Sequence, residues 1–116
     1  MIEKLSDWRF NLYGRRRGKK LSERQKDYIL NYLPTVSLLG INNCENPKRE
    51  KVNLKEIFHD DSPIWLEIGF GGGEHLLSLA KGNKNINFIG CEPYLNGVAM
   101  LLPRLASENL SNVKIF

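Results

Sequence analysis

The sequence predicts an α/β fold built on an open parallel sheet that is incomplete at about three strands, with an N-terminal basic and helical extension. From residue 63 onward, apolar runs typical of strands alternate with patterns typical of helices. The strand-like runs are 64–68, 87–92 and 113–116, and the helical patterns are 73–81 and 95–109. This alternation favours a parallel sheet, in which right-handed crossovers place consecutive strands side by side. A glycine-rich turn follows the first run, at the end of a strand where open α/β sheets bind small ligands.

The chain divides into three regions: a basic arm and helix (1–34), a polar linker (35–62) and the sheet-forming region (63–116). Residues 1–26 carry nine Lys and Arg against three acidic residues, a net charge of +6, so the rest of the chain carries −2 of the total +4. A basic arm on a mildly acidic body indicates a polyanionic partner, most simply nucleic acid.

The candidate phosphate contacts lie in a basic loop, 13–20, that contains two glycines. They are Arg15, Arg16, Arg17, Lys19 and Lys20. Phosphate contact by such a cluster is one interpretation. A solvated charged tail is the other, and the residues alone leave both open.

The first helix is expected to begin after Ser22, because Gln25 three residues later completes a capping box. Apolar residues at Tyr28, Ile29, Tyr32 and Leu33 would form one face, packed outside the main sheet. We expect Pro34 to end this helix. In the linker, only 53–58 suggests a helical turn.

Two residues are unexpected inside the 95–109 helix. Pro103 should kink or split it, and Gly97 should weaken it near its start. In the first strand, we expect Trp65, Leu66 and Ile68 to be buried core residues.

Several classes of protein are disfavoured. No apolar run approaches the roughly 18 residues of a membrane span, and the first residues lack the apolar core of a signal peptide. The two cysteines, Cys44 and Cys91, fit no metal-ligand spacing, and His59 and His75 stand alone. We therefore expect a cytoplasmic protein without a metal site.

The glycine-rich turn matches the pattern E-x-G-x-G-x-G through Glu67, Gly69, Gly71 and Gly73. The dinucleotide fingerprint G-x-G-x-x-G would require glycine where Glu74 stands, and a carboxylate there would repel a pyrophosphate. A nicotinamide- or flavin-dependent oxidoreductase is therefore disfavoured. The turn should instead offer backbone N–H groups and a strand-end carboxylate to a small ligand without a phosphate group.

A second acidic residue, Glu92, ends the 87–92 run. A carboxylate at this place can accept hydrogen bonds from both hydroxyls of a ribose. Dinucleotide enzymes share this feature, so it supports an adenosyl ligand without identifying it. Phe70, between the glycines, is expected to form a wall of the ligand pocket or part of the core.

The E-x-G-x-G-x-G pattern resembles the first motif of class I S-adenosylmethionine-dependent methyltransferases. The segments 66–74, 87–92 and 110–113, with 13–18 and 21–25 upstream, resemble the bacterial tRNA (guanine-N(7)-)-methyltransferase family in order and in residues. A small departure is Gly72, where that family usually has methionine.

The resemblance implies a Rossmann-like class I methyltransferase fold. It implies the reaction of a tRNA (guanine(46)-N(7))-methyltransferase, with S-adenosyl-L-methionine as donor and S-adenosyl-L-homocysteine as product. The basic arm matches a region associated with tRNA. The implied cofactor-binding residues are Glu67, Gly69, Phe70, Gly71, Gly73 and Glu92.

By the same resemblance, the family's catalytic residues are expected beyond Phe116, so we expect the chain to be the cofactor-binding N-terminal part and inactive alone. The first strand would then have an open apolar edge that favours self-association. The alternative hypothesis is a non-catalytic RNA-binding module with a relic methyltransferase fold. RNA binding without cofactor affinity, unaffected by Glu67→Ala and Glu92→Ala, would favour that alternative.

Overall fold

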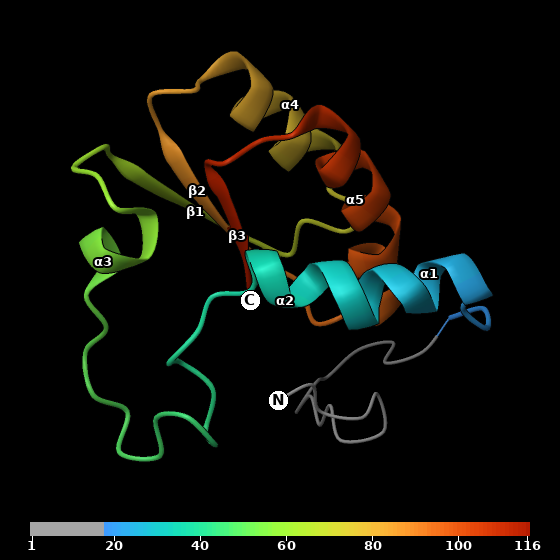
Figure 1. The fold of residues 1–116 in the computed structure, drawn as a ribbon, viewed down its shortest axis with the longest axis horizontal. Coiled ribbons are helices and arrows are strands. Elements are labelled where there is room, and N and C mark those ends of the chain that lie inside the picture. Colours follow the sequence, from blue (N-terminus) through green and yellow to red (C-terminus); the bar gives the residue numbers. More distant parts are fainter. Residues whose placement is uncertain (1–17) are drawn as a thin grey trace.

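The computed structural model describes residues 18–116, and its centre is a three-stranded parallel sheet in the order β1-β2-β3 (Figure 1). The strands are β1 (Ile64–Ile68), β2 (Asn87–Cys91) and β3 (Val113–Ile115). Ile64 lies opposite Asn87, and Phe88 lies opposite Val113. The predicted strands, their parallel pairing and their order are confirmed.

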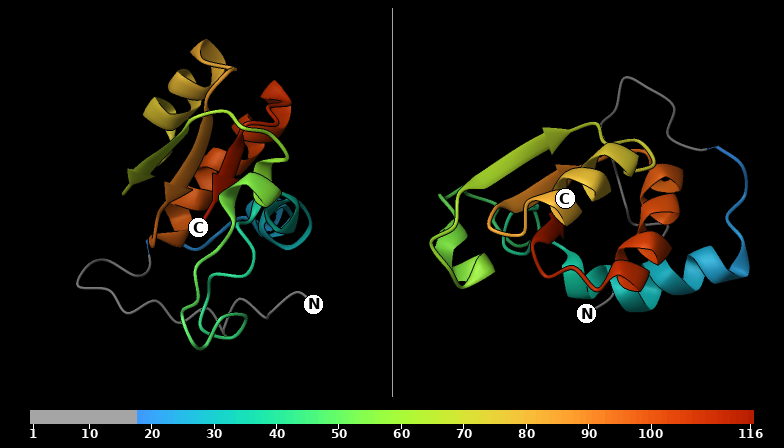
Figure 2. Two further views of the ribbon diagram at one scale, coloured as in Figure 1. Left: turned by 90° about the vertical axis from the view of Figure 1, so that its left-hand side faces the viewer. Right: turned by 90° about the horizontal axis from the view of Figure 1, so that it is seen from above.

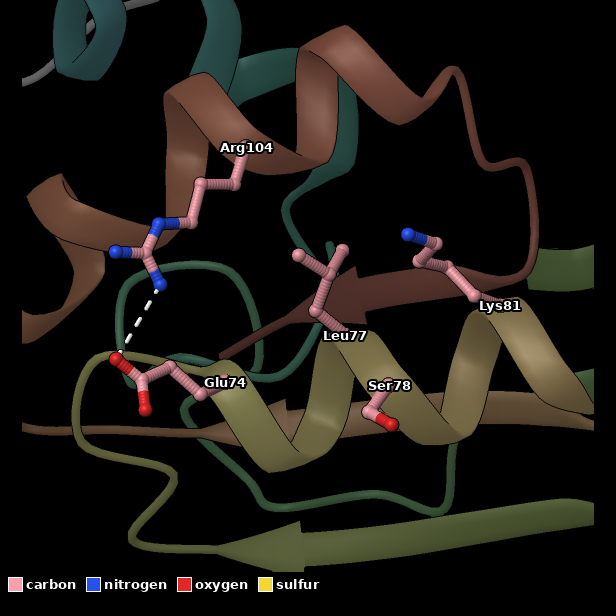
Figure 3. A pocket seen from close by; sticks show the side chains of 5 residues that line it. All are labelled: Glu74, Leu77, Ser78, Lys81 and Arg104. Atoms are coloured by element: carbon pink, nitrogen blue, oxygen red, sulfur yellow. Dashed lines mark hydrogen bonds and ion pairs between the residues drawn. The ribbon is translucent and has the colours of Figure 1, made fainter.

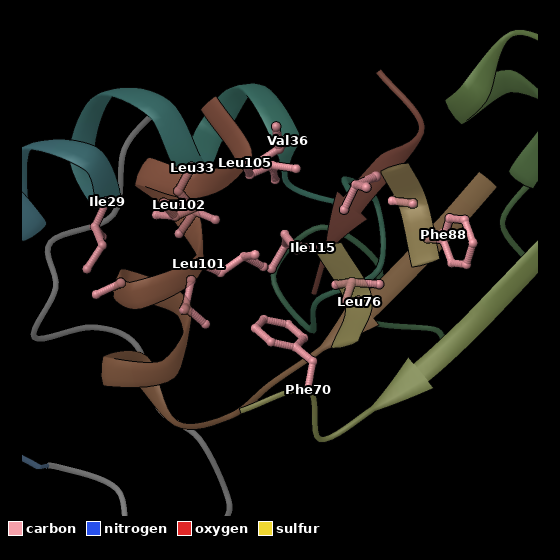
Figure 4. Packing of buried hydrophobic residues seen from close by; sticks show 14 residues of the cluster. Ile29, Leu33, Val36, Phe70, Leu76, Phe88, Leu101, Leu102, Leu105 and Ile115 are labelled. Atoms are coloured by element: carbon pink, nitrogen blue, oxygen red, sulfur yellow. The ribbon is translucent and has the colours of Figure 1, made fainter. Parts of the chain in front are cut away.

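Two helices connect the strands, α4 (Glu74–Gly82) and α5 (Leu95–Glu108), and both cover the same face of the sheet (Figure 2). Right-handed crossovers between strands that follow one another in the sheet place their helices on one face. Leu76 of α4 and Leu101 of α5 are fully buried between the helices and the sheet. The same core contains Phe88 of β2 and Ile115 of β3 (Figure 4).

The predicted capping box begins the first helix. The Ser22 hydroxyl accepts from the Gln25 amide at 3.1 Å, and the Gln25 side chain accepts from the Ser22 amide at 3.0 Å. The helical region runs through α1 (Glu23–Asp27), a π-helical stretch labelled η2 (Tyr28–Tyr32) and α2 (Leu33–Val36).

The expectation that Pro34 ends this helix is wrong, because helical structure continues to Val36. In the π-helical stretch the Leu33 amide bonds to the Tyr28 carbonyl, five residues back. Pro34 then falls in the first turn of α2, where a missing amide hydrogen is tolerated. The helix ends where Ser37 becomes extended.

The N-terminal helical region belongs to the same core as the sheet. Ile29, Leu33 and Val36 are buried with Leu102 and Leu105 of α5 (Figure 4). The chain leaves α2 along β3, where the Leu38 amide donates to the Ile115 carbonyl at 2.8 Å. This region therefore lies beside α5 and at the β3 edge.

The expected splitting of the 95–109 helix does not occur, since α5 is one helix with Pro103 inside it. Proline in a helix interior costs about 3 kcal/mol. Leu101, Leu102 and Leu105 on either side are fully buried, and their packing offsets that cost. In the linker, the predicted turn is present as α3 (Leu54–Phe58), capped by the Asn53 side chain, which accepts from the Lys55 amide.

The expected burial of β1 is wrong. Trp65, Leu66 and Ile68 are 49%, 59% and 77% exposed. Within residues 18–116, β1 pairs with β2 alone, so its other edge is uncovered. Trp65 still packs edge-on against Phe88, with ring centroids 5.8 Å apart. Among residues 18–116, no helix combines the length and the apolar character that spanning a bilayer requires.

Candidate cofactor site

The turn between β1 and α4 has a backbone conformation that requires glycine. Gly69, Gly71 and Gly73 have φ angles of 79°, 61° and 77°, in the left-handed region. A residue with a Cβ atom loses roughly 1–2 kcal/mol in that region. A Cβ atom at Gly69 or Gly71 would meet nothing within 4 Å, so the turn is open on that side. At Gly73 it would lie 2.6 Å from Leu101, so this glycine also lets α4 approach α5.

The glycine amides were expected to be free for a ligand, and this is wrong for three of them. Gly69 donates to the Cys91 carbonyl at 2.7 Å, and Gly73 donates to the Phe70 carbonyl at 2.9 Å. Gly71 donates to Oε2 of Glu92 at 3.2 Å. The main contribution of the turn is therefore that a ligand can approach its backbone closely.

Glu67, the fourth residue of β1, has unused hydrogen-bonding capacity. Its Oε1 lies 3.4 Å from Nδ1 of His75, and its Oε2 is buried without a hydrogen-bond partner among the described residues. A carboxylate has about four acceptor positions. Buried polar atoms are nearly always satisfied, and leaving one unpaired is costly. A cationic ligand group beside this carboxylate would supply the hydrogen-bond donor that the described residues do not.

Glu92 directly follows β2 and holds the turn in place. Its Oε2 accepts from Gly71, and within the described residues this is the only hydrogen bond of its side chain. Its backbone amide donates to the Phe116 carbonyl at 3.1 Å. One carboxylate oxygen thus supports the turn, and the other is available to a ligand.

Gly97 contributes to the site in a way that sequence reasoning missed. A Cβ atom there would lie 2.3 Å from the Gly71 carbonyl oxygen and 3.4 Å from Cγ of Glu92. Glycine at this place lets the start of α5 touch both the turn and its supporting carboxylate. The available signal was a glycine in the first turn of a helix, which helix propensity alone disfavours.

Asn96, next to Gly97, is a second residue that sequence reasoning missed. Its Oδ1 accepts from the Gly18 amide at 3.2 Å, and its Nδ2 donates to the Lys19 carbonyl at 2.6 Å. The start of α5 thereby holds the end of the basic loop, where Lys19 and Lys20 are exposed. The other predicted phosphate contacts lie outside the described residues; they are Arg15, Arg16 and Arg17.

The Phe70 side chain is part of the core rather than of an open pocket. It is 6% exposed and lies close enough to Gly90 that a Cβ atom there would be 2.9 Å from its ring. Burial against Leu76 of α4 fixes the path of the turn (Figure 4). Any contact of Phe70 with a ligand would therefore come from its backbone.

A surface hollow between α4 and α5 is a poor candidate for a ligand site (Figure 3). Its charged groups are already paired: Arg104 lies 3.4 Å from Glu74 within the hollow, and Lys81 lies 3.0 Å from Glu108 outside its lining. Glu74 is thus directed toward α5. In the described part of the chain, no group of three or more His, Cys, Asp or Glu could hold a metal ion.

Comparison with known proteins finds similarity to methyltransferases. A family model described as putative methyltransferase matches residues 61–116. The chain is 48% identical over 107 residues to the tRNA (guanine-N(7)-)-methyltransferase of Paracoccus denitrificans, covering 92% of this chain and 46% of that protein. Residues 61–116 thus match a methyltransferase family, and the chain as a whole is similar to part of this relative. Similar relatives with the same name occur in Cereibacter sphaeroides (46% identity, 93% of this chain, 44% of the relative) and Jannaschia sp. (43%, 91%, 44%).

The chain spans somewhat less than half the length of these methyltransferases. The segment that matches the methyltransferase model, 61–116, runs from just before β1 through β3. It contains every candidate cofactor residue, from Glu67 to Glu92, and also Gly97.

Proposed function

We propose that the chain is the cofactor-binding part of a tRNA (guanine-N(7)-)-methyltransferase that takes S-adenosyl-L-methionine as methyl donor. The observation that carries the proposal is Oε2 of Glu67, which is buried without a hydrogen-bond partner among the described residues, beside a glycine turn with an open outer side. The family match and the names of the relatives support the same activity. A cytoplasmic location follows from the proposed tRNA substrate.

The residues present fit this cofactor. Glu67 would pair with its ammonium group, and the free oxygen of Glu92 would accept from a ribose hydroxyl. Gly69 and Gly71 would let it approach the backbone on the open side of the turn. When bound, S-adenosylmethionine supplies an electrophilic methyl group. Guanine N7 carries a lone pair and no proton at neutral pH, so positioning of the acceptor matters more than a general base.

Isothermal titration calorimetry with S-adenosylhomocysteine tests the cofactor half of the proposal. We expect the wild-type chain to bind it, Glu67→Gln to weaken binding through loss of the ammonium partner, and Glu92→Ala to weaken binding through loss of the ribose contact. Asp61→Asn is a matched control, since Asp61 is exposed and paired with Lys55 away from the turn. Absence of binding by the wild-type chain would contradict the proposal.

The tRNA half of the proposal rests on the basic arm, of which Lys19 and Lys20 are described and exposed. Phosphate contacts make affinity fall with rising salt concentration. We expect electrophoretic mobility shifts with unmodified tRNA to weaken in salt, and a Lys19→Ala, Lys20→Ala double variant to bind less tightly with a shallower salt dependence. Binding of tRNA without any affinity for S-adenosylhomocysteine would instead support the RNA-binding module.

We also propose that the chain self-associates through the outer edge of β1. Leu66 and Ile68 are exposed there, and an uncovered apolar strand edge pairs readily with another strand. Sedimentation velocity over a wide concentration range should show association that Ile68→Lys reduces. A monodisperse wild-type monomer throughout that range would contradict this proposal.

A further inference from the structure

We propose that His75 is a positioning residue that holds the Glu67 carboxylate in the orientation that receives the ammonium group of the cofactor. This inference rests on the proposed function, because it concerns the same ligand. It goes further by assigning a role to a histidine that the sequence pattern left unexplained.

The contact joins the two ends of the glycine turn. Glu67 stands one residue before the end of β1, and His75 is the second residue of α4. Their side chains meet at 3.4 Å between Nδ1 and Oε1. An ionised carboxylate only accepts hydrogen bonds, so Nδ1 must carry the hydrogen. The His75–Glu67 contact therefore links the end of β1 to the start of α4 across the glycine turn.

The contact is suited to orienting the carboxylate rather than to stabilising the fold. The His75 side chain is 73% exposed, and such surface contacts contribute little to stability. The Glu67 side chain is 25% exposed, and among the described residues His75 is its only hydrogen-bond partner. Without His75, no hydrogen bond from the described residues fixes the orientation of this carboxylate, and a ligand would have to order it on binding.

The expected effect follows from the cost of ordering one flexible side chain when a ligand binds. That cost corresponds to about a two- to tenfold loss of affinity. The loss should appear only for ligands that carry the ammonium group. 5′-Methylthioadenosine has the adenosyl part of the cofactor without its amino acid, so its binding should not depend on His75.

The test is calorimetry of the wild-type chain and variants with both probes, S-adenosylhomocysteine and 5′-methylthioadenosine. We expect His75→Ala to bind S-adenosylhomocysteine two- to tenfold more weakly and methylthioadenosine as tightly as wild type. His75→Asn, whose amide can donate from near the place of Nδ1, should recover most of the loss. His75→Gln, whose donor lies one bond farther out, should recover less. In a Glu67→Gln background, His75→Ala should have almost no further effect.

The two proposals fail in different ways. Equal losses for both probes, or a His75→Ala effect that persists unchanged in the Glu67→Gln background, would overturn the role of His75 and leave the proposed function standing. No S-adenosylhomocysteine binding by the wild-type chain would overturn both. If circular dichroism shows that His75→Ala is unfolded, the role of His75 is tested by comparing His75→Asn with His75→Gln. Equal affinities of these two variants for S-adenosylhomocysteine would overturn the proposal.

Discussion

Replacing Gly97 with alanine should damage both the fold and the candidate site. The new Cβ atom would lie 2.3 Å from the Gly71 carbonyl oxygen and 2.9 Å from its carbon, both backbone atoms. Overpacking of this kind costs typically 1–3 kcal/mol, and the backbone contact favours the upper part of that range. Alanine regains about 1 kcal/mol of helix propensity over glycine. We therefore expect Gly97→Ala to lower the free energy of unfolding by about 1–2 kcal/mol in urea titrations.

The same substitution should weaken cofactor binding. Relief of the contact must move α5 or the turn, and either movement disturbs Glu92, whose Cγ is 3.4 Å from the new atom. A loss of about tenfold in affinity for S-adenosylhomocysteine corresponds to about 1.4 kcal/mol. Gly82→Ala is the matched control, because Gly82 ends α4 and a Cβ atom there meets nothing within 4 Å. A Gly97→Ala variant as stable as Gly82→Ala, with wild-type affinity, would contradict this prediction.

Three further predictions concern the fold. Leu102→Ala empties a fully buried position and should lower the free energy of unfolding in urea by about 2–5 kcal/mol; a loss below about 1 kcal/mol would contradict the described core. Ser22→Ala removes the capping box and should cost about 0.5–2 kcal/mol in the same assay, whereas Ser78→Ala should be nearly neutral. The Ser62 amide and then the Asn87 side chain hold the pKa of Asp60 below 3.8, so this carboxylate stabilises the fold above about pH 4 and less as pH falls through its lowered pKa. Melting temperatures below pH 4 should therefore fall more steeply for wild type than for Asp60→Asn, and parallel curves would contradict this.

The elements from β1 onward could be predicted because their signals are local. The bounds of β1 were predicted without error, and those of β2, α4 and α5 within one residue. The capping box was predictable for the same reason, since Ser22 and Gln25 are three residues apart. The glycine pattern predicted the turn, because left-handed φ angles at alternate positions restrict those positions to glycine.

The remaining features depend on contacts between residues distant in the sequence. Gly97 looks unfavourable when α5 is considered alone. The reason for a glycine there is its close packing against the backbone of Gly71, 26 residues earlier. Pro34 looks like a helix end until a π-helical stretch moves it into a first turn. The apolar residues of β1 look like core, and their exposure depends on what covers the outer edge and the faces of that strand. Periodicity carries no information on any of these three.

The start of α5 connects the two halves of the proposed function. Gly97 packs its backbone against the cofactor turn, and the adjacent Asn96 holds Gly18 and Lys19 at the end of the basic loop. A Cβ atom at Gly18 would meet the Tyr94 hydroxyl, so Gly18 is in close contact with this part of the chain. Any shift of the cofactor turn that moves this end of α5 must therefore also move the lysines. The candidate cofactor site and the described end of the basic loop, with Lys19 and Lys20, thus meet at one short segment of the fold.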